Sequence, residues 1–417
     1  MSDRVTNWAG NIVFAAQQLH RPTSIPELQN LVAGTDRLRL RLRVLGSGHS
    51  FNRISDTTGD LISLAALPRV VEVSADRRTV RVDGGIRYGD LVAHLDAAGL
   101  ALHNLASLPH ISVAGAITTA THGSGERNGN LATAVAAIEL VRADGELVVL
   151  RRGEPGFAGA VVGLGALGVI TALTLDVVPT FEIRQYVYDD LSRDALGQHL
   201  PDILAAGYSV SLFTNWASTT INHAWVKRHD PMPDGPFFGA RPADGPRHPV
   251  PGLPADNSTE QAGVPGPWHA RLPHFRMEFT PSTGAELQSE YMVPRERALE
   301  AIDAVARVRE KIAPVLQVNE IRTVAADDLW LSMNYQRDSL GLHFTWIADT
   351  AAVLPAVAAL EESLASLDAR PHWGKVFTMD PATVRSRYER FADFAELVKW
   401  YDPTGTFRNA WLDDLLG

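Results

Sequence analysis

Leu45-Gly46-Ser47-Gly48-His49-Ser50-Phe51-Asn52 is the stretch of this sequence that most constrains its fold and function. It directly follows a predicted strand at residues 38–45. Glycine has no Cβ, so backbone N–H groups in this stretch can converge on a phosphate, and the serines add hydroxyl donors. The dinucleotide-binding fingerprint would need a third glycine and a helix immediately afterwards. Taken alone, the stretch is equally compatible with a plain turn between two strands.

Two further segments have the same small, Gly-rich character. Residues 106–125 include Ser112, a good N-cap for a short helix of small residues whose amino end would offer free N–H groups to an anion. Residues 164–171 form the other segment. Small side chains let a flat cofactor lie close to the backbone, so the three segments together favour a cofactor site over isolated turns.

The order of predicted elements indicates an α+β fold with two domains. The first 180 residues alternate Gly-rich turns and a helix at 88–98 with short strands at 38–45, 79–83, 135–142, 147–150 and 168–178. Later, helices at 295–312 and 351–367 accompany strands at 209–216, 223–227, 275–279, 287–292, 316–324 and 342–347. Such a run of strands with few helices predicts an antiparallel sheet covered on one face.

These patterns set the expected domain boundaries. We expect one domain at residues 1–180 and a second at residues 181–370. The segment 371–417 should form a strand and then a helix at about 383–399, rejoin the first domain and contribute to the active site. Eleven of the 25 prolines lie between Pro231 and Pro273, which predicts an extended, ordered crossover or lid, with a flexible linker as the alternative.

Composition excludes several classes of function. The 417 residues are 45% hydrophobic and 21% charged, with a net charge of −10 and no basic cluster, so neither nucleic acid nor an anionic membrane is an expected partner. We see neither a signal peptide nor an apolar run that could span a bilayer, and expect a cytoplasmic protein. Cysteine is absent, which removes disulfides, thiolate metal sites and thiol nucleophiles. His103, His110 and His122 lack metal-ligand spacing, so no metal is expected.

Polar side chains interrupt three predicted strands in the second half. Strand alternation places Glu320 and Arg322 on one face, and His343 and Thr345 on one face of another strand. Lys375 lies between large apolar residues in the third, at 373–377. A solvated sheet face is the ordinary interpretation of any one such strand. Together they fit a pocket for a polyol, since each buried hydroxyl needs a matched hydrogen-bond partner.

Four motifs carry a resemblance to a known family: Asn7-Trp8-Ala9-Gly10-Asn11, Gly46-Ser47-Gly48-His49-Ser50, Ser107-Leu108-Pro109-His110 and Asp402-Pro403 with Phe407. The chain resembles flavoproteins of the vanillyl-alcohol-oxidase type and, more closely, the alditol oxidases, which are relatives of the sugar-lactone oxidases. This resemblance implies a two-domain fold with bound FAD. It also implies that the flavin 8α-methyl group is bonded to a ring nitrogen of His49. With no cysteine in the chain, the link is single.

The resemblance extends to the remaining site residues. His122 is implied to lie near the flavin without bonding it. The other implied cofactor-binding residues are Val44, Leu45, Gly46, Ser47, Gly48, Ser50, Ser107, Ser112, Gly115, Ala116, Ile117, Thr118, Thr119, Gly168 and Ile170. The implied substrate-binding residues are Ser107, Glu320, Arg322, His343, Thr345 and Lys375.

The implied reaction is oxidation of the terminal primary alcohol of an alditol such as xylitol or sorbitol, with hydride transfer to flavin N5 and reoxidation by O2 to give hydrogen peroxide. Arg322 and Lys375 are the implied catalytic residues, because cations at the C1 oxygen stabilise its developing alkoxide character. A sugar-1,4-lactone oxidase or dehydrogenase is the main alternative. A non-catalytic flavin- or carbohydrate-binding protein is the other.

Overall fold

The computed structural model describes residues 5–280 and 284–417, and its N-terminal part is built on an antiparallel sheet of five strands. In spatial order these strands are β4 (Val71–Val73), β5 (Thr79–Asp83), β9 (Val169–Asp176), β7 (Val135–Val141) and β8 (Leu147–Arg151). A small parallel sheet beside it contains β1 (Leu19–His20), β3 (Asp60–Ile62) and β2 (Leu42–Val44). The Gly-rich stretch that contains His49 begins where β2 ends.

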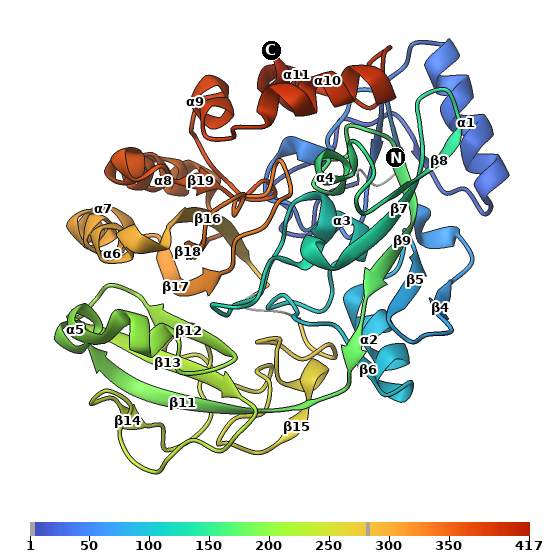
Figure 1. The fold of residues 1–417 in the computed structure, drawn as a ribbon. Coiled ribbons are helices and arrows are strands. Elements are labelled where there is room, and N and C mark those ends of the chain that lie inside the picture. The colour runs from blue at the N-terminus through green and yellow to red at the C-terminus, as the bar shows by residue number, and fades with distance from the viewer. Residues whose placement is uncertain (1–4, 281–283) are drawn as a thin grey trace.

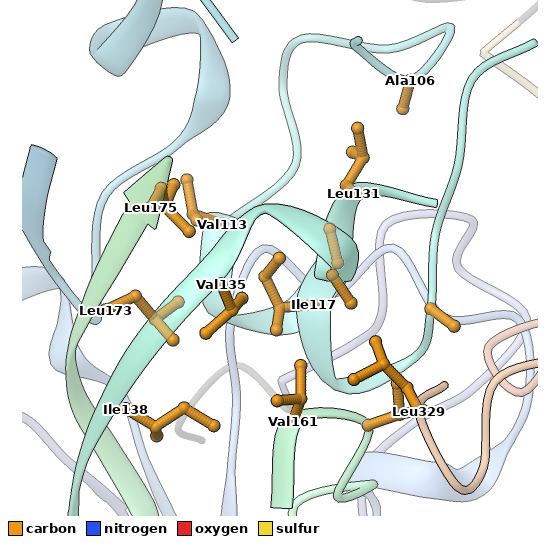
Figure 2. Close-up of a cluster of buried hydrophobic side chains, with 14 of the residues drawn as sticks. Ala106, Val113, Ile117, Leu131, Val135, Ile138, Val161, Leu173, Leu175 and Leu329 are labelled. Carbon is orange, nitrogen blue, oxygen red and sulfur yellow. The ribbon is translucent and has the colours of Figure 1, made fainter. Parts of the chain in front are cut away.

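Short helices pack on the five-stranded sheet and complete its core. They are α1 (Ile25–Arg37), α2 (Tyr88–Ala97), α3 (Val113–Thr118) and α4 (Phe157–Val161). Figure 2 shows Val113 and Ile117 of α3 beside Val135 and Ile138 of β7 and Leu173 of β9. Because α3 buries this apolar face, its opposite face of small residues is left toward the Gly-rich loops.

The second part is a nine-stranded antiparallel sheet. Eight strands follow in the order β14 (Arg241–Pro242), β11 (Glu182–Ser192), β13 (Thr220–Arg228), β12 (Ser209–Thr214), β17 (Leu316–Val324), β18 (Ser339–Ile347), β16 (Glu286–Pro294) and β19 (Arg370–Pro371). The ninth strand, β15 (Gly266–Pro267), pairs with β11. A two-stranded ribbon of β6 (Leu100–Ala101) and β10 (Val178–Pro179) lies in the N-terminal part.

Both faces of the large sheet are buried at its centre, which corrects the expectation of one covered face. Apolar residues such as Ile321 and Phe344 pack under the helices α5 (Arg193–Leu204), α6 (Ala298–Arg307), α7 (Arg309–Ile312) and α8 (Thr350–Leu364). The polar face lies toward the N-terminal part, where Gly125 donates its backbone N–H to the carbonyl of Thr323. A solvated sheet face is therefore the wrong interpretation of these polar strands.

One helix differs from the prediction that no apolar run is long enough to span a bilayer. Residues Thr350–Leu367 are long and apolar enough, by length and composition, to cross a membrane. However, Val353, Val357, Leu360 and Leu364 are buried in the core under the large sheet. Only 33% of the stretch is buried, so one face of the helix packs under the large sheet and the other lies outside that core.

Several predicted elements differ from those in the structure. The strands at 275–279 and 373–377 are absent from the structure, which describes both ranges, and 373–377 is a turn and irregular chain. The strand at 38–45 shortens to β2, and the helix at 295–312 is interrupted at Val308 between α6 and α7. The helix at 383–399 is two helices, α9 (Pro381–Ser386) and α10 (Phe391–Tyr401), which precede α11 (Ala410–Leu416). Short 3-10 helices lie at Arg53–Ser55, Leu64–Ala66, Leu131–Ala134, Trp268–Ala270, Arg295–Arg297 and Ala365–Leu367.

The Pro-rich segment is an extended layer on the edge of the large sheet. Its strands β14 and β15 pair with β11, and Arg247 donates through two nitrogens to the carboxylate of Asp189. Gln185 donates to the backbone oxygens of Thr259 and Glu260. These contacts fit an ordered crossover and not a free linker. Its last residues continue directly to His274 and Phe275, which line the central cavity.

The C-terminal segment crosses back to the N-terminal part, where its helices are the red elements in Figure 1. Leu42 of β2 donates its backbone N–H to the carbonyl of Thr406 at 2.7 Å. Buried Arg43 donates to the carbonyl oxygens of Phe407 and Gly165, which joins the chain terminus to the third Gly-rich segment. The route of the segment places Lys375 between the two parts of the molecule.

Candidate active site

One continuous cavity joins the three Gly-rich segments to the polar face of the large sheet. Of the residues assigned to cofactor and substrate, it is lined by Val44, Leu45, Gly46, Ser47, Gly48, His49, Ser50, Ser107, Ser112, Gly115, Ala116, Thr118, Thr119, His122, Gly168, Ile170, Glu320, Arg322, His343, Thr345 and Lys375. Ile117 is the exception. It has no exposed surface and packs in the core beneath α3 (Figure 2).

The imidazole of His49 is held in the Gly-rich end of this cavity. Its ring is stacked on the indole of Trp8, with 4.8 Å between ring centroids and 16° between ring planes. Trp8 in turn donates its backbone N–H to the carbonyl of Gly48. Among the described residues, neither ring nitrogen of His49 meets a hydrogen-bond partner of good geometry. Burial lowers the pKa of His49 to about 4, so the ring is neutral at pH 7 and its lone pair is free.

The walls at this end of the cavity suit a large flat group. Alanine, serine, threonine and glycine dominate the lining, and a Cβ on Gly84 would lie only 2.1 Å from the carbonyl oxygen of Ile170. Ser47 accepts the backbone N–H of Ser112 at 3.1 Å, which ties the first Gly-rich segment to the second. The unpartnered buried imidazole of His49 and the narrow backbone walls fit the residues needed to hold a flavin.

Strand register places the polar side chains in one row. Glu320 of β17 pairs with His343 of β18, and His343 pairs in turn with Glu290 of β16. The neighbouring row contains Val318, Thr345 and Gln288 in the same order. Because paired residues on adjacent strands project from the same face, these side chains meet in the cavity. Arg322 lies two residues along β17 from Glu320 and shares its face.

Glu290 is the centre of this polar network, and the sequence analysis missed it. Its carboxylate lies 2.8 Å from the guanidinium of Arg322, 2.6 Å from the ammonium of Lys375 and 3.3 Å from Nε2 of His122. Although burial opposes ionisation, Arg322 and Lys375 hold the pKa of Glu290 well below its usual range. The two cations are thus fixed by one shared carboxylate, which keeps them both near the same point of the cavity.

Lys375 reaches the network from a turn after β19 and not from a strand. Asn52, three residues after His49, donates to the carbonyl oxygens of Trp373 and Lys375 at 2.8 and 2.9 Å. The Lys375 ammonium also lies 2.6 Å from Nδ1 of His343. Burial lowers the pKa of His343 to about 4, so its neutral ring accepts at Nδ1 and carries its proton on Nε2, 3.3 Å from Thr345 Oγ1.

Arg322 joins this network to the Gly-rich side. Its NH1 lies 3.2 Å from the hydroxyl of Ser107 and 3.4 Å from the carboxylate of Glu320. The other oxygen of Glu320 lies 2.9 Å from Nε2 of His274, a residue that the sequence analysis also missed. Opposing the effect of burial, Arg322 and His274 lower the pKa of Glu320. The site is therefore a buried cluster in which both charge signs are paired.

A signal for two of the missed residues was present in the sequence. Gln288 and Glu290 alternate with Leu287, Ser289 and Tyr291 in an otherwise apolar strand, which is the pattern that pointed to Glu320 and Arg322. His274 and His372 lie outside strands, so alternation could not find them. Within residues 5–280 and 284–417, the structure has no cluster of histidines and carboxylates arranged to hold a metal ion.

Comparison with known proteins agrees with this geometry. Residues 16–151 match the model of the FAD binding domain, and residues 283–415 match that of D-arabinono-1,4-lactone oxidase. An alditol oxidase of Streptomyces sp. (strain IKD472 / FERM P-14339) is 54% identical over 420 residues, which cover all of both chains. An L-gulono-1,4-lactone dehydrogenase of Mycobacterium tuberculosis is 31% identical over 444 residues, again covering both chains completely.

Solved structures share the fold. The crystal structure of cholesterol oxidase from B. sterolicum has a TM-score of 0.81 at 16% identity and covers 99% of this chain and 96% of its own. A solvent-stable cholesterol oxidase has a TM-score of 0.79 with similar coverage. The α+β fold of the vanillyl-alcohol-oxidase type is thereby confirmed. The full-length identity, the FAD-binding domain and the paired polar cavity establish that the chain belongs to the alditol oxidase family of FAD-dependent oxidoreductases.

Proposed function

We propose that this protein oxidises the terminal primary alcohol of alditols such as xylitol and sorbitol to the aldose, with FAD bonded to a ring nitrogen of His49. FAD, when bound, supplies the hydride acceptor at its N5 atom and passes the electron pair to O2, which yields hydrogen peroxide. The observation that carries the proposal is the continuous cavity, in which the Gly-rich segments face a row of buried polar side chains. The Streptomyces relative is named an alditol oxidase, which supports the alditol part of the proposal.

His49 supports the covalent part of the proposal. The attacking atom must be an unprotonated ring nitrogen, and a pKa near 4 leaves the ring neutral across the physiological range. Stacking on Trp8 fixes the plane of the ring, and Asn7 and Asn11 hold the neighbouring carbonyl oxygens of Ser50 and Phe51. The chain has no cysteine that could form a second link.

Arg322 and Lys375 are assigned to the reacting end of the substrate. Held by Glu290, both cations stay near one point without moving during the reaction, and preorganised charge of this kind stabilises an oxygen that becomes negative. The C1 hydroxyl would take this position, within reach of both cations. The Ser107 hydroxyl, 3.2 Å from Arg322, would contact the same end of the substrate.

Glu320, His343, Thr345 and Gln288 are assigned to the remaining hydroxyls. They offer one acceptor-only carboxylate and three groups that both donate and accept, which suits a chain carrying a hydroxyl on every carbon. A hydrocarbon alcohol would leave these buried groups unmatched, at a cost of about 1–3 kcal/mol each. The site therefore favours a polyol over a simple alcohol.

A sugar-1,4-lactone is the second candidate substrate, because the matched lactone-oxidase model covers the part of the chain with Glu290, Arg322 and Lys375. The two candidates are separated by mixing the purified yellow protein without oxygen with xylitol or with L-gulono-1,4-lactone. Rapid loss of the yellow colour with xylitol and not with the lactone is the expected result. The opposite result would assign the protein to the lactone-oxidising relatives.

A further inference from the structure

A buried lysine lies on the same face of the large sheet as Arg322, two strands away, in contact with no residue of the proposed reacting end. Lys227 of β13 is 1% exposed, although charged lysines are seldom fully buried without partners. Its ammonium contacts the carbonyl oxygen of Leu272, that of Pro273 at 3.2 Å and Nδ1 of His274 at 3.2 Å. An ammonium has three donors, so these three acceptors use all of them.

The contact with Lys227 decides where His274 carries its proton. Burial lowers the pKa of Lys227 to about 7, and the protonated form, which is favoured below this pH, can only donate. Opposite this ammonium, Nδ1 of His274 must present a lone pair. Burial, followed by the charge of Lys227, lowers the pKa of His274 to about 4, so the ring has a single proton, which is then on Nε2. That nitrogen lies 2.9 Å from Oε1 of Glu320 and donates to it.

The imidazole of His274 is also fixed in orientation. The rings of Phe213 and Trp225 meet it edge-on, with centroid distances of 5.4 and 5.3 Å. The backbone N–H groups of His274 and Phe275 both donate to the carbonyl oxygen of Ser107. Lys227 of the large sheet thus contacts residues 272–274, and this stretch is in turn hydrogen-bonded to the second Gly-rich segment.

We infer that Lys227 and His274 are positioning residues for Glu320. By fixing the proton on His274 Nε2, the ammonium of Lys227 makes the imidazole a donor to one oxygen of Glu320. Arg322 lies 3.4 Å from the other oxygen. The carboxylate is therefore held in one orientation, with its remaining lone pairs directed into the cavity. Those lone pairs select a substrate hydroxyl away from the reacting carbon. The inference rests on the proposed function, because it assigns Glu320 to a polyol hydroxyl.

The test compares xylitol with glycerol, which is too short to offer every hydroxyl. His274→Leu should lose about 10- to 100-fold in kcat/KM for xylitol, mainly through KM, and much less for glycerol, because a hydrogen bond to a charged group is removed. His274→Gln should keep most of the xylitol preference, since its amide N–H can replace Nε2–H. Lys227→Met should resemble His274→Leu, because the proton is then free to move to Nδ1.

His223→Leu is the matched control for His274→Leu, since His223 is also buried and also pairs with a carboxylate, that of Asp189 at 2.9 Å. It should leave the ratio of xylitol to glycerol unchanged. Equal losses for both substrates in His274→Leu, or no rescue by His274→Gln, would overturn the inference. If the wild-type protein oxidised no alditol at all, the proposed function itself would be overturned.

A second measurement reports the position of the His274 proton directly. Long-range ¹H–¹⁵N correlation spectra of the ¹⁵N-histidine-labelled holoprotein report which ring nitrogen carries the proton, and the signals missing in His274→Gln assign the residue. We expect His274 to be neutral with the proton on Nε2 at pH 7. A proton on Nδ1, or on both nitrogens, would contradict the role assigned to Lys227.

Discussion

The ammonium of Lys375 lies 2.6 Å from a carboxylate oxygen of Glu290, whose side chain is completely buried. The same carboxylate pairs with Arg322, so its removal would leave two buried cations without their shared partner. Breaking a buried ion pair by removing one partner costs about 3–5 kcal/mol. Glu290→Gln should lower the free energy of unfolding by this amount, measured by urea denaturation of the holoprotein.

A surface pair provides the control for this measurement. Arg390 and Asp393 form a bridge at 2.5 Å with side chains 38% and 51% exposed. Solvent-exposed pairs contribute about 0–1 kcal/mol, so Asp393→Asn should change stability little. If Glu290→Gln and Asp393→Asn had equal effects, Glu290 would not be the centre of the network.

The covalent link predicts where the colour goes when the protein is denatured. After acid precipitation of the wild-type protein the yellow colour should stay in the pellet, and in His49→Ala it should move to the supernatant. Trp8→Phe should keep the link, because a smaller aromatic ring can still stack on His49. A colourless wild-type pellet would show that FAD is not covalently bound.

Removing either cation should slow the reaction more than it weakens substrate binding. Interactions with charge that develops during the reaction affect kcat, whereas interactions present throughout affect KM. Arg322→Ala and Lys375→Ala should each lose about 10²-fold or more in kcat, by analogy with the loss of a single oxyanion donor. A variant whose kcat stayed near that of the wild type would assign its cation a purely structural role.

Two buried imidazoles should make the free energy of unfolding depend on pH in the acid range. The pKa values of His274 and His343 are lowered from 6.5 to about 4, in each case chiefly by burial. Between pH 6.5 and 4 the unfolded chain binds protons that the folded chain does not, so stability falls as the pH falls through this range. Each group contributes up to about 1.4 kcal/mol per pH unit.

His343→Asn isolates one of these contributions. Because it removes one imidazole from the folded core, its unfolding free energy should fall less steeply between pH 6.5 and 4 than that of the wild type. The measurement is the urea midpoint at several pH values in this range. Identical slopes for the two proteins would show that His343 is not neutral in the folded state.

Periodicity predicted the elements whose side chains follow one simple pattern. The strands Thr79–Asp83 and Leu316–Val324 have the predicted bounds, because each alternates between two distinct environments. The strand Glu182–Ser192 was not predicted, since buried polar Gln185 and Asp189 disturb its alternation, and their partners come from the Pro-rich segment. When the partner of a buried polar residue lies far away along the chain, the local sequence pattern does not reveal it.

The same physical reason limited how much of the site could be predicted from the sequence. Glu320 and Arg322 could be predicted to share a face because strand geometry alone requires it. That Glu290 joins them depends on the register of β16 against β18, which only the folded sheet defines. Lys375 was placed on a strand because its neighbours are large and apolar, whereas the backbone there turns to reach Asn52.

Substrate choice tests the central claim most directly. The measurement is kcat/KM from hydrogen peroxide production by the purified holoprotein with xylitol, sorbitol, glycerol, 1-propanol and L-gulono-1,4-lactone in parallel. Two unmatched buried polar groups cost about 2–6 kcal/mol, so xylitol or sorbitol should exceed glycerol by tens-fold to over 10⁴-fold. Glycerol should in turn exceed 1-propanol. Similar values for long alditols and short alcohols, or peroxide from the lactone alone, would contradict the assignment of this site to polyols.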